Sequence, residues 1–407
     1  MKRKGLLKLI IGVSLVVVIT IAIPLTTSCA GPAPTPTPEP TPTPEPTPTP
    51  EPEPAPDAYE EYVAGLSGGA LPVPRDAFEQ ARAEGRINIY DWAEWWPEEI
   101  YEGFSQEYGI EIVRDLFADM DELLGKFKLN PDAEYDFTLP ESRTFIQMRE
   151  LGLLQPINHD WIPNANEYLP EDTKQSQEAP GYQYGVASDL FIQGYSYNTT
   201  YVDDPRIPSW GALLEPDEKY KGRITMLNSM YGTVGATLKY LGYSWNSVDE
   251  DELMEAKEVL LQQKPWVMAY ESWPVRLMLE EEAWMAQQWY GDAYFLSREL
   301  DTLRVALPTE GTQKGIDYMV IPIGSPHSAA AHLFIDYILR PEVNTLLIET
   351  IAYLPNHTTS GQFLSEELRG ALPSQEYLSD KCEWETPQSY TGIGLELRSA
   401  IWEELKQ

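Results

Sequence analysis

A run of prolines limits the fold of this chain more than any other feature of its sequence. From Pro32 to Pro56 every second residue is proline, with Thr, Glu and Ala between. Such a segment cannot build a packed core and favours an extended polyproline helix. At about 3.1 Å per residue, roughly 25 residues would reach on the order of 80 Å. We therefore expect residues 29–57 to form a stalk and the globular part to follow it.

The residues before the prolines have the layout of a secretory signal peptide. A basic start, an apolar run over residues 6–23 and small residues at 26–28 precede Cys29. Residues 1–28 are therefore predicted to be removed. The junction is similar to a lipoprotein cleavage site, although Thr26 stands where an aliphatic residue is usual. We expect a lipidated Cys29 that holds an exported protein at the extracytoplasmic face of the cell membrane, in the periplasm or at the cell surface. An uncleaved membrane anchor is the alternative.

Charge and cysteine content narrow the function further. The 407 residues include 64 acidic and 29 basic side chains, a net charge of −35, which argues against a nucleic-acid-binding protein. An acidic surface attracts cations, so it fits a cationic ligand without establishing one. The other cysteine is Cys382, and with Cys29 lipidated no disulfide is expected.

Short apolar runs alternate with helical patterns after a polar approach segment, residues 58–85. Strands are predicted at 87–90, 110–113, 135–139, 191–197, 223–227, 303–306 and 318–321. Helices are predicted at 75–84, 97–108, 120–129, 142–151, 234–241, 251–261, 274–282, 328–339 and 341–350. Strands separated by helices predict an α/β architecture with largely parallel sheets and room for two lobes.

Motifs of enzymes are missing from the sequence. It contains no nucleophile elbow, no phosphate-binding loop and no dinucleotide fingerprint. The four histidines lack zinc-ligand spacing apart from the loose pair His327 and His332, so neither a metal nor a cofactor is expected. Aromatic residues beside many carboxylates are also typical of a sugar-cleaving cleft, so an anchored glycan-active enzyme stays an alternative.

The first predicted strand ends in a cluster of tryptophans around one acid. Trp92, Glu94, Trp95 and Trp96 follow it directly. Ligands of α/β proteins tend to bind at the carboxyl ends of strands. The cluster therefore predicts the edge of a pocket, with packing against the next helix as the alternative.

From this cluster onward the chain resembles the spermidine/putrescine-binding proteins, the solute receptors of polyamine ABC transporters. The similar segments keep the order of that family and cover essentially all of residues 86–407. They are YDWAEW at 90–95, FSQEYGIEIV at 104–113, YDFTLP at 135–140, MRELG at 148–152, SWGAL at 209–213, YKG at 220–222, FIDYILRP at 334–341 and IAYLPN at 351–356.

The resemblance implies a type II periplasmic-binding-protein-like fold. Two lobes, each a mainly parallel sheet flanked by helices, would be joined by crossing strands and close on a ligand. Lobe 1 would comprise residues 86–193 and 316–361, and lobe 2 residues 194–315 and 362–407. The partners implied are the permease subunits of an ABC importer, with the receptor itself a monomer.

The resemblance also implies a polyamine ligand. Protonated amines on a methylene chain need carboxylates and aromatic faces around them. The site residues that carry over from the family are Trp92, Glu94, Trp95, Trp289, Asp317, Tyr353 and Glu385. Alternatives stay open, because Trp289 could be core, Tyr353 could cap a helix and Asp317 could pair with Lys314.

Several positions depart from the family pattern. Ser229 and Gly232 stand where the family carries an aspartate and a glutamate for a second amine, and Gly315 stands in place of a tryptophan. Glu141 and Arg143 lie where the family has small and aromatic residues. Arg143 is a permanent cation. Facing the cleft it would favour a different small, zwitterionic solute, whereas a salt bridge to Glu141 would neutralise it.

Overall fold

The structure is a computed structural model that describes residues 57–92, 96–176 and 178–407. The predicted signal peptide, Cys29 and the stalk lie outside the described residues, as do Glu94 and Trp95. All described residues belong to the unit Pro56–Gln407. Within it, no helix combines the length and apolar composition needed to cross a membrane. Cys382 is a buried free thiol.

Strands and helices alternate along the described chain. The strands are β1 (Arg86–Trp92), β2 (Glu111–Phe117), β3 (Phe137–Thr138), β4 (Val186–Asn198), β5 (Ile224–Met226), β6 (Val267–Tyr270), β7 (Met285–Trp289), β8 (Leu303–Ala306), β9 (Thr312–Met319), β10 (Leu354–Pro355) and β11 (Cys382–Trp384). The longer helices are α1 (Ala58–Gly65), α2 (Arg75–Glu84), α3 (Glu98–Tyr108), α4 (Met120–Leu129), α5 (Ser142–Glu150), α9 (Met230–Tyr240), α10 (Glu250–Gln263), α12 (Tyr290–Glu299), α13 (Ser328–Ile338), α14 (Pro341–Ile351) and α17 (Gly392–Lys406). The shorter helices are α6 (Pro163–Tyr168), α7 (Glu171–Lys174), α8 (Gly211–Leu214), α11 (Val275–Leu279), α15 (Glu366–Ala371) and α16 (Gln375–Asp380).

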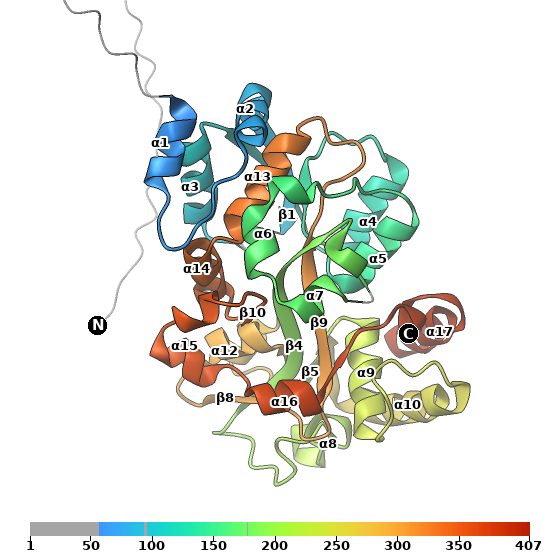
Figure 1. The fold of residues 1–407 in the computed structure, drawn as a ribbon. Coiled ribbons are helices and arrows are strands. Elements are labelled where there is room, and N and C mark those ends of the chain that lie inside the picture. Colours follow the sequence, from blue (N-terminus) through green and yellow to red (C-terminus); the bar gives the residue numbers. More distant parts are fainter. Residues whose placement is uncertain (1–56, 93–95, 177) are drawn as a thin grey trace, which may run out of the picture. The chain divides into compact units, whose positions relative to one another are not determined.

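The first sheet follows the predicted α/β pattern. β1 pairs in parallel with β2 on one side and with β3 on the other. Ile87 and Ile89 of β1 are fully buried, because alternate residues of a strand face the same side. Helix α13, buried from Ala329 to Ile338, contacts β1. Tight packing therefore fixes β1, whose carboxyl end is Trp92 (Figure 1).

The second sheet is mixed rather than largely parallel. Its strand order is β11-β9-β4-β7-β5-β6, with β8 and β10 also paired to β4. β4 runs antiparallel to β7, β8 and β9, whereas β5 pairs in parallel with β6 and β7.

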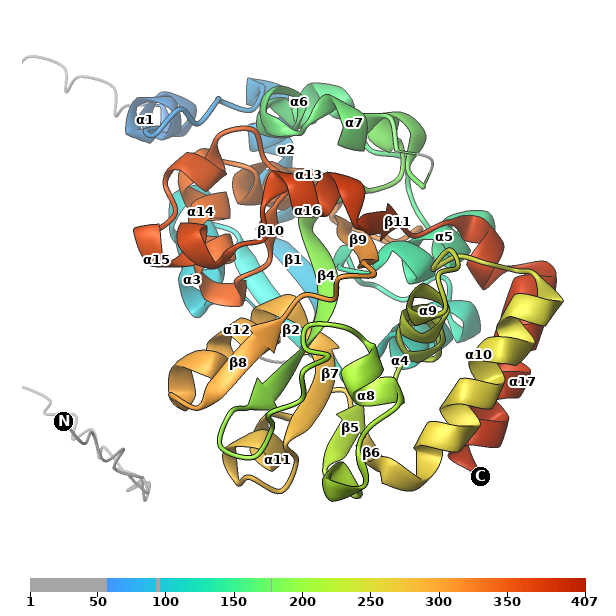
Figure 2. The same ribbon diagram turned by 90° about the horizontal axis from the view of Figure 1, so that it is seen from below.

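Strands β4 and β9 run side by side between the upper and lower parts of Figure 1. Phe191 and Ile192 of β4 belong to the core that contains Ile89, whereas Tyr195 belongs to the core that contains Trp210. One strand thus contributes to two cores. Helices α10 and α17 lie side by side on the second core (Figure 2).

The approach segment is packed rather than a loose connection. Tyr62 of α1 stacks on Phe78 of α2 at 4.9 Å between ring centroids, and both rings are buried. The hydroxyl oxygen of Tyr62 also accepts the backbone N–H of Val73 at 3.0 Å. Residues 58–84 therefore belong to the folded body, because their few aromatic side chains fill its core.

The sequence analysis missed several elements, among them β7, α12 and α17. β7 is the informative case, because it buries two glutamines. Gln287 donates to Oε1 of Gln193 at 3.0 Å, and Gln288 donates to the hydroxyl of Ser196 at 2.6 Å. Polar side chains paired with each other break the apolar pattern by which strands are recognised.

Candidate functional site

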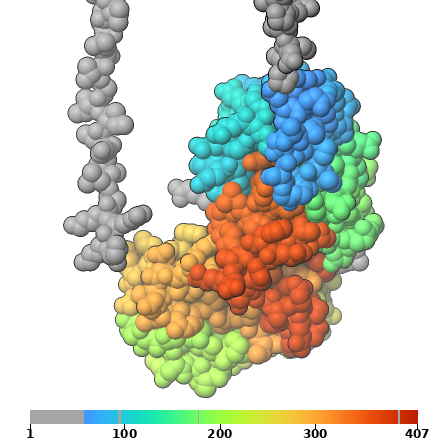
Figure 3. Space-filling model, turned by 60° about the vertical axis from the view of Figure 1, so that its left-hand side comes forward, coloured from blue at the N-terminus to red at the C-terminus, as the bar shows by residue number. Residues whose placement is uncertain are grey.

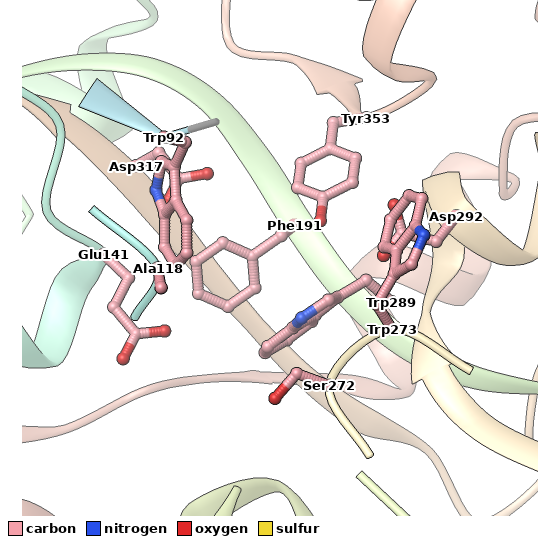
Figure 4. A pocket seen from close by; sticks show the side chains of 10 residues that line it. All are labelled: Trp92, Ala118, Glu141, Phe191, Ser272, Trp273, Trp289, Asp292, Asp317 and Tyr353. Carbon is pink, nitrogen blue, oxygen red and sulfur yellow. The ribbon is translucent and has the colours of Figure 1, made fainter. Parts of the chain in front are cut away.

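A cavity of about 400 Å³ lies at the carboxyl ends of strands β1, β2 and β7, beside strands β4 and β9. It is lined by Trp92, Ala118, Glu141, Phe191, Ser272, Trp273, Trp289, Asp292, Asp317 and Tyr353 (Figure 4). On the face drawn in Figure 3, a recess separates the cyan surface near α3 from the gold surface near α12. The carboxyl ends of strands meet at this cavity, as they do at ligand sites of other α/β proteins.

Aromatic side chains form most of the cavity wall. Trp92 packs on Phe117 with ring centroids 4.6 Å apart. Phe191 meets Trp289 edge to face at 5.0 Å. Trp273, in the loop between β6 and α11, is 57% exposed although it lines the cavity. The wall therefore offers several π faces, which attract cations and cover methylene groups.

Asp317 is the central acid of the cavity. It lies on β9, is 6% exposed and forms an isolated antiparallel bridge with Glu141, the residue before α5. Burial first, and then the charges of Asp189 and Glu141, hold the pKa of Asp317 well above its usual range. No basic side chain takes part, so a cation is the partner that would restore its usual pKa.

Asp292 is a second acid, on the opposite side of the cavity. Figure 4 shows Asp317 beside Trp92, Asp292 beside Trp289 and Tyr353, and Phe191 between the two sides. Asp292 lies in the first turn of α12 and is 6% exposed. Burial raises its pKa to about 7, with no neighbouring cation to oppose that effect.

A close approach of two segments places Asp292. A Cβ on Gly291 would lie 2.4 Å from the carbonyl oxygen of Ile351 and 2.5 Å from the ring of Tyr353. Only glycine lets the start of α12 approach that loop so closely. Gly291 therefore brings Asp292 and Tyr353 to the same side of the cavity.

Arg143 is held by its neighbours. Its guanidinium lies 2.6 Å from Oε1 of Glu141 and 4.7 Å from the centre of the Tyr231 ring. Arg143 is not among the residues that line the cavity. The salt bridge to Glu141, one of the two possibilities drawn from the sequence, is the arrangement found.

Two other predicted site residues lie away from the cavity lining. Ser229 caps α9, and its hydroxyl accepts the N–H of Gly232 at 3.1 Å. Glu385 follows β11 and is 6% exposed, and burial together with the charge of Glu141 holds its pKa well above the usual range. The structure thus brings together Trp92, Glu141, Trp289, Asp317 and Tyr353, whereas Ser229, Arg143 and Glu385 stand outside the lining.

Sequence reasoning missed Ala118, Phe191, Ser272, Trp273 and Asp292. A signal existed for Asp292, because it lies three residues after Trp289, the spacing of one helical turn. A signal for Trp273 is its position directly before Pro274 in an acidic loop. Phe191 gave none, because its place depends on pairing with a strand more than a hundred residues away.

Comparisons with known proteins identify the family and the fold of this chain. Residues 99–369 match the family described as bacterial extracellular solute-binding protein. The spermidine/putrescine-binding periplasmic protein of Salmonella typhimurium is 28% identical over 347 residues, which cover 84% of this chain and 96% of that protein. The protein of the same name from Escherichia coli is 26% identical over 346 residues, with 84% and 97% covered.

A solved structure matches the fold over most of its length. The spermidine/putrescine ABC transporter substrate-binding protein PotD from Streptococcus pneumoniae has a TM-score of 0.68 and 23% identity, covering 79% of this chain and 99% of PotD. The predicted two-lobed α/β fold of the type II periplasmic-binding-protein kind is thereby confirmed. The glycan-active enzyme is set aside, because the matched family consists of binding proteins. The chain belongs to the bacterial extracellular solute-binding proteins, which are receptors and not enzymes.

Proposed function

We propose that this receptor binds a polyamine of the putrescine or spermidine type in the aromatic cavity. One observation carries the proposal: acids at two sides of the cavity, Asp317 and Asp292, are buried without a cation beside them. Buried carboxylates that lack a partner are costly. A diamine would supply an ammonium group to each acid and place its methylenes against Phe191 and the tryptophans.

The second amine would have a different acid from the one that the resemblance implied. Ser229 and Gly232 supply no carboxylate, but Asp292 does, from the start of α12. Relatives named as spermidine/putrescine-binding support the ligand class. Arg143 is paired with Glu141, so the structure offers no specific support for a zwitterionic solute.

Binding of a ligand panel to the purified protein tests this proposal. Putrescine and spermidine should raise the melting temperature, and calorimetry should return a binding constant for each. Amino acids and sugars of similar size serve as controls. A shift with sugars or amino acids and none with the amines would refute the polyamine proposal.

The remaining parts of the proposal concern location and partners. The receptor would be anchored through a lipid on Cys29, stand clear of the membrane on its proline stalk and deliver its ligand, as a monomer, to the permease of an ABC importer. The sequence before residue 57 and the names of the relatives support this. The lobe boundaries proposed above, 86–193 with 316–361 and 194–315 with 362–407, stay a prediction.

Cys29→Ser tests the anchor. The variant should move from the membrane fraction to the soluble fraction, and mass spectrometry should find no lipid on its amino terminus. An unlipidated wild-type protein that stays in the membrane would favour the uncleaved anchor instead.

A further inference from the structure

Another carboxylate, outside the cavity lining, lies next to Asp317. Asp189 on β4 lies directly opposite Asp317 on β9 in the antiparallel register. Directly opposed residues project from the same face, with Cβ atoms about 4.5–5.5 Å apart. Asp189 is fully buried and does not line the cavity. Neither of its carboxyl oxygens has a hydrogen-bond donor with good geometry among the described residues.

The surroundings of the Asp189–Asp317 pair contain further acids instead of cations. Glu141 faces Asp317 from the start of α5, and Glu385 acts on it from the segment after β11. Burial, and then the charges of nearby aspartates that include Asp317 and Asp189, hold the pKa of Tyr353 well above its usual range. Ser188 is a further polar neighbour, and it interacts with Asp189.

The basic side chains nearest in sequence to Glu141 and to Asp317 are engaged elsewhere. Arg143 binds Glu141, and Lys314 lies 4.5 Å from the centre of the Trp384 ring. Two carboxylates that touch in a buried site cannot both be ionised without a cation. Burial raises the pKa of Asp189 to about 7, and the pKa of Asp317 is raised further by its interaction with Asp189.

We propose that Asp189 is a positioning residue that shares one proton with Asp317 in the empty protein, and that a cationic ligand expels this proton when it binds. The inference rests on the proposed function of the cavity. The proton leaves the carboxyl pair for solvent, and the ammonium group of the ligand takes its place as the positive charge. Asp189 thereby keeps Asp317 neutral, which lowers the free-energy cost of burying its carboxyl group until a cation binds.

A proton released on binding makes affinity depend on pH. Below the pKa of the pair in the empty protein, the dissociation constant should fall up to about tenfold for each unit that the pH rises. Above that pKa the pair is already ionised, and affinity should no longer change. Below that pKa the shared proton keeps the doubly charged pair from forming in the empty cavity.

Calorimetry with butylamine, a monoamine that would meet Asp317 and not Asp292, near pH 6.5 in two buffers of different ionisation enthalpy counts the protons released. The wild-type protein should release close to one proton per ligand and Asp189→Asn clearly fewer. Glu178→Gln is the matched control, because Glu178 is also buried with its pKa raised to about 7 but bonds Tyr318 instead of Asp317. It should release as many protons as the wild type. Binding without proton release would overturn this inference and leave the proposed function intact.

A second measurement needs no ligand. The empty pair holds a proton that the unfolded chain has lost, so folded wild-type protein should lose stability as the pH rises from about 5 to about 7. Asp189→Asn lacks the pair, so its melting temperature should rise relative to wild type over that interval. Parallel curves for the two proteins would overturn the shared proton, even if no amine bound at all.

Discussion

The ring of Phe191 occupies the space beside the α-carbon of Gly315. The two residues are partners across β4 and β9, and a Cβ on Gly315 would lie 2.1 Å from Cζ of Phe191. The resemblance predicts a tryptophan at position 315, where this chain has glycine. Phe191 supplies an aromatic face from the neighbouring strand instead.

This contact predicts that Phe191→Ala removes most of the destabilisation caused by Gly315→Ala. Gly315→Ala should reduce the free energy of unfolding by about 1–3 kcal/mol, because the new methyl group forces the Phe191 ring aside. In a Phe191→Ala background the same substitution should cost much less, because the space is then open. Denaturant unfolding of the four proteins measures the coupling. Gly125→Ala in α4 is the control, since no atom lies within 4 Å of its would-be Cβ, and it should be neutral or stabilising. Additive effects at 191 and 315 would contradict the exchange.

Asp317 and Asp292 should contribute differently to the binding of a monoamine and of a diamine. Asp317→Asn should abolish measurable binding of both a monoamine and putrescine, because it removes the central anion; losing one partner of a buried pair costs about 2–5 kcal/mol. Asp292→Asn should weaken putrescine and spare a monoamine such as butylamine. Titration calorimetry with the two amines measures this. Equal losses for both amines in Asp292→Asn would show that one ammonium group does not reach that acid.

Trp273 should report ligand binding by its fluorescence. It is 57% exposed in the empty protein, and a ligand or lobe closure that covers it would shift its emission to shorter wavelength. Trp273→Phe should remove most of the change. Trp384→Phe is the control, because Trp384 is 37% exposed but does not line the cavity. The same spectral change in Trp273→Phe as in wild type would contradict a role for this side chain at the cavity.

His357 should make the fold sensitive to acid. Its Nε2–H donates to the carbonyl of Leu339, and its Nδ1 accepts the N–H of Ser360, each at 3.0 Å. Burial lowers its pKa from 6.5 to about 4. The unfolded chain therefore takes up a proton first as the pH falls, and up to about 3 kcal/mol of stability should be lost between pH 6.5 and 4.

Denaturant unfolding at a series of pH values checks this expectation. His357→Gln should be less stable than wild type at neutral pH and should lose less of its stability towards acid. If the curve of His357→Gln parallels that of wild type, the acid sensitivity lies in another group.

The sequence was sufficient to predict the elements in which buried residues recur at a regular spacing. The bounds of α2, α4 and β8 agree with the prediction residue for residue, because apolar spacing and, for α4, the cap Asp119 are local signals. β7 was missed because Gln287 and Gln288 find their hydrogen-bond partners, Gln193 and Ser196, only after β7 has paired with the distant strand β4.

The site was predicted in part for the same reason. Trp92, Trp289, Asp317 and Tyr353 stand in motifs that can be read along the chain, and the cavity contains all four. Asp292 and Phe191 depend on Gly291 and Gly315, whose missing side chains make room for close approaches. Such approaches join segments that are distant in sequence, so local patterns do not show them.

The two cores have a consequence for how the chain is made. One core draws on residues from Tyr62 to Tyr390, and the other on residues from Tyr195 to Leu405. A growing chain that has not yet reached β9 and α13 lacks the residues that these two elements contribute to the first core. A chain that stops before α17 lacks Ile401 and Leu405 of the second core. The first core cannot close before β9 and α13 have been synthesised, and the second cannot close before α17, so the chain stays without its final packing until those elements have formed.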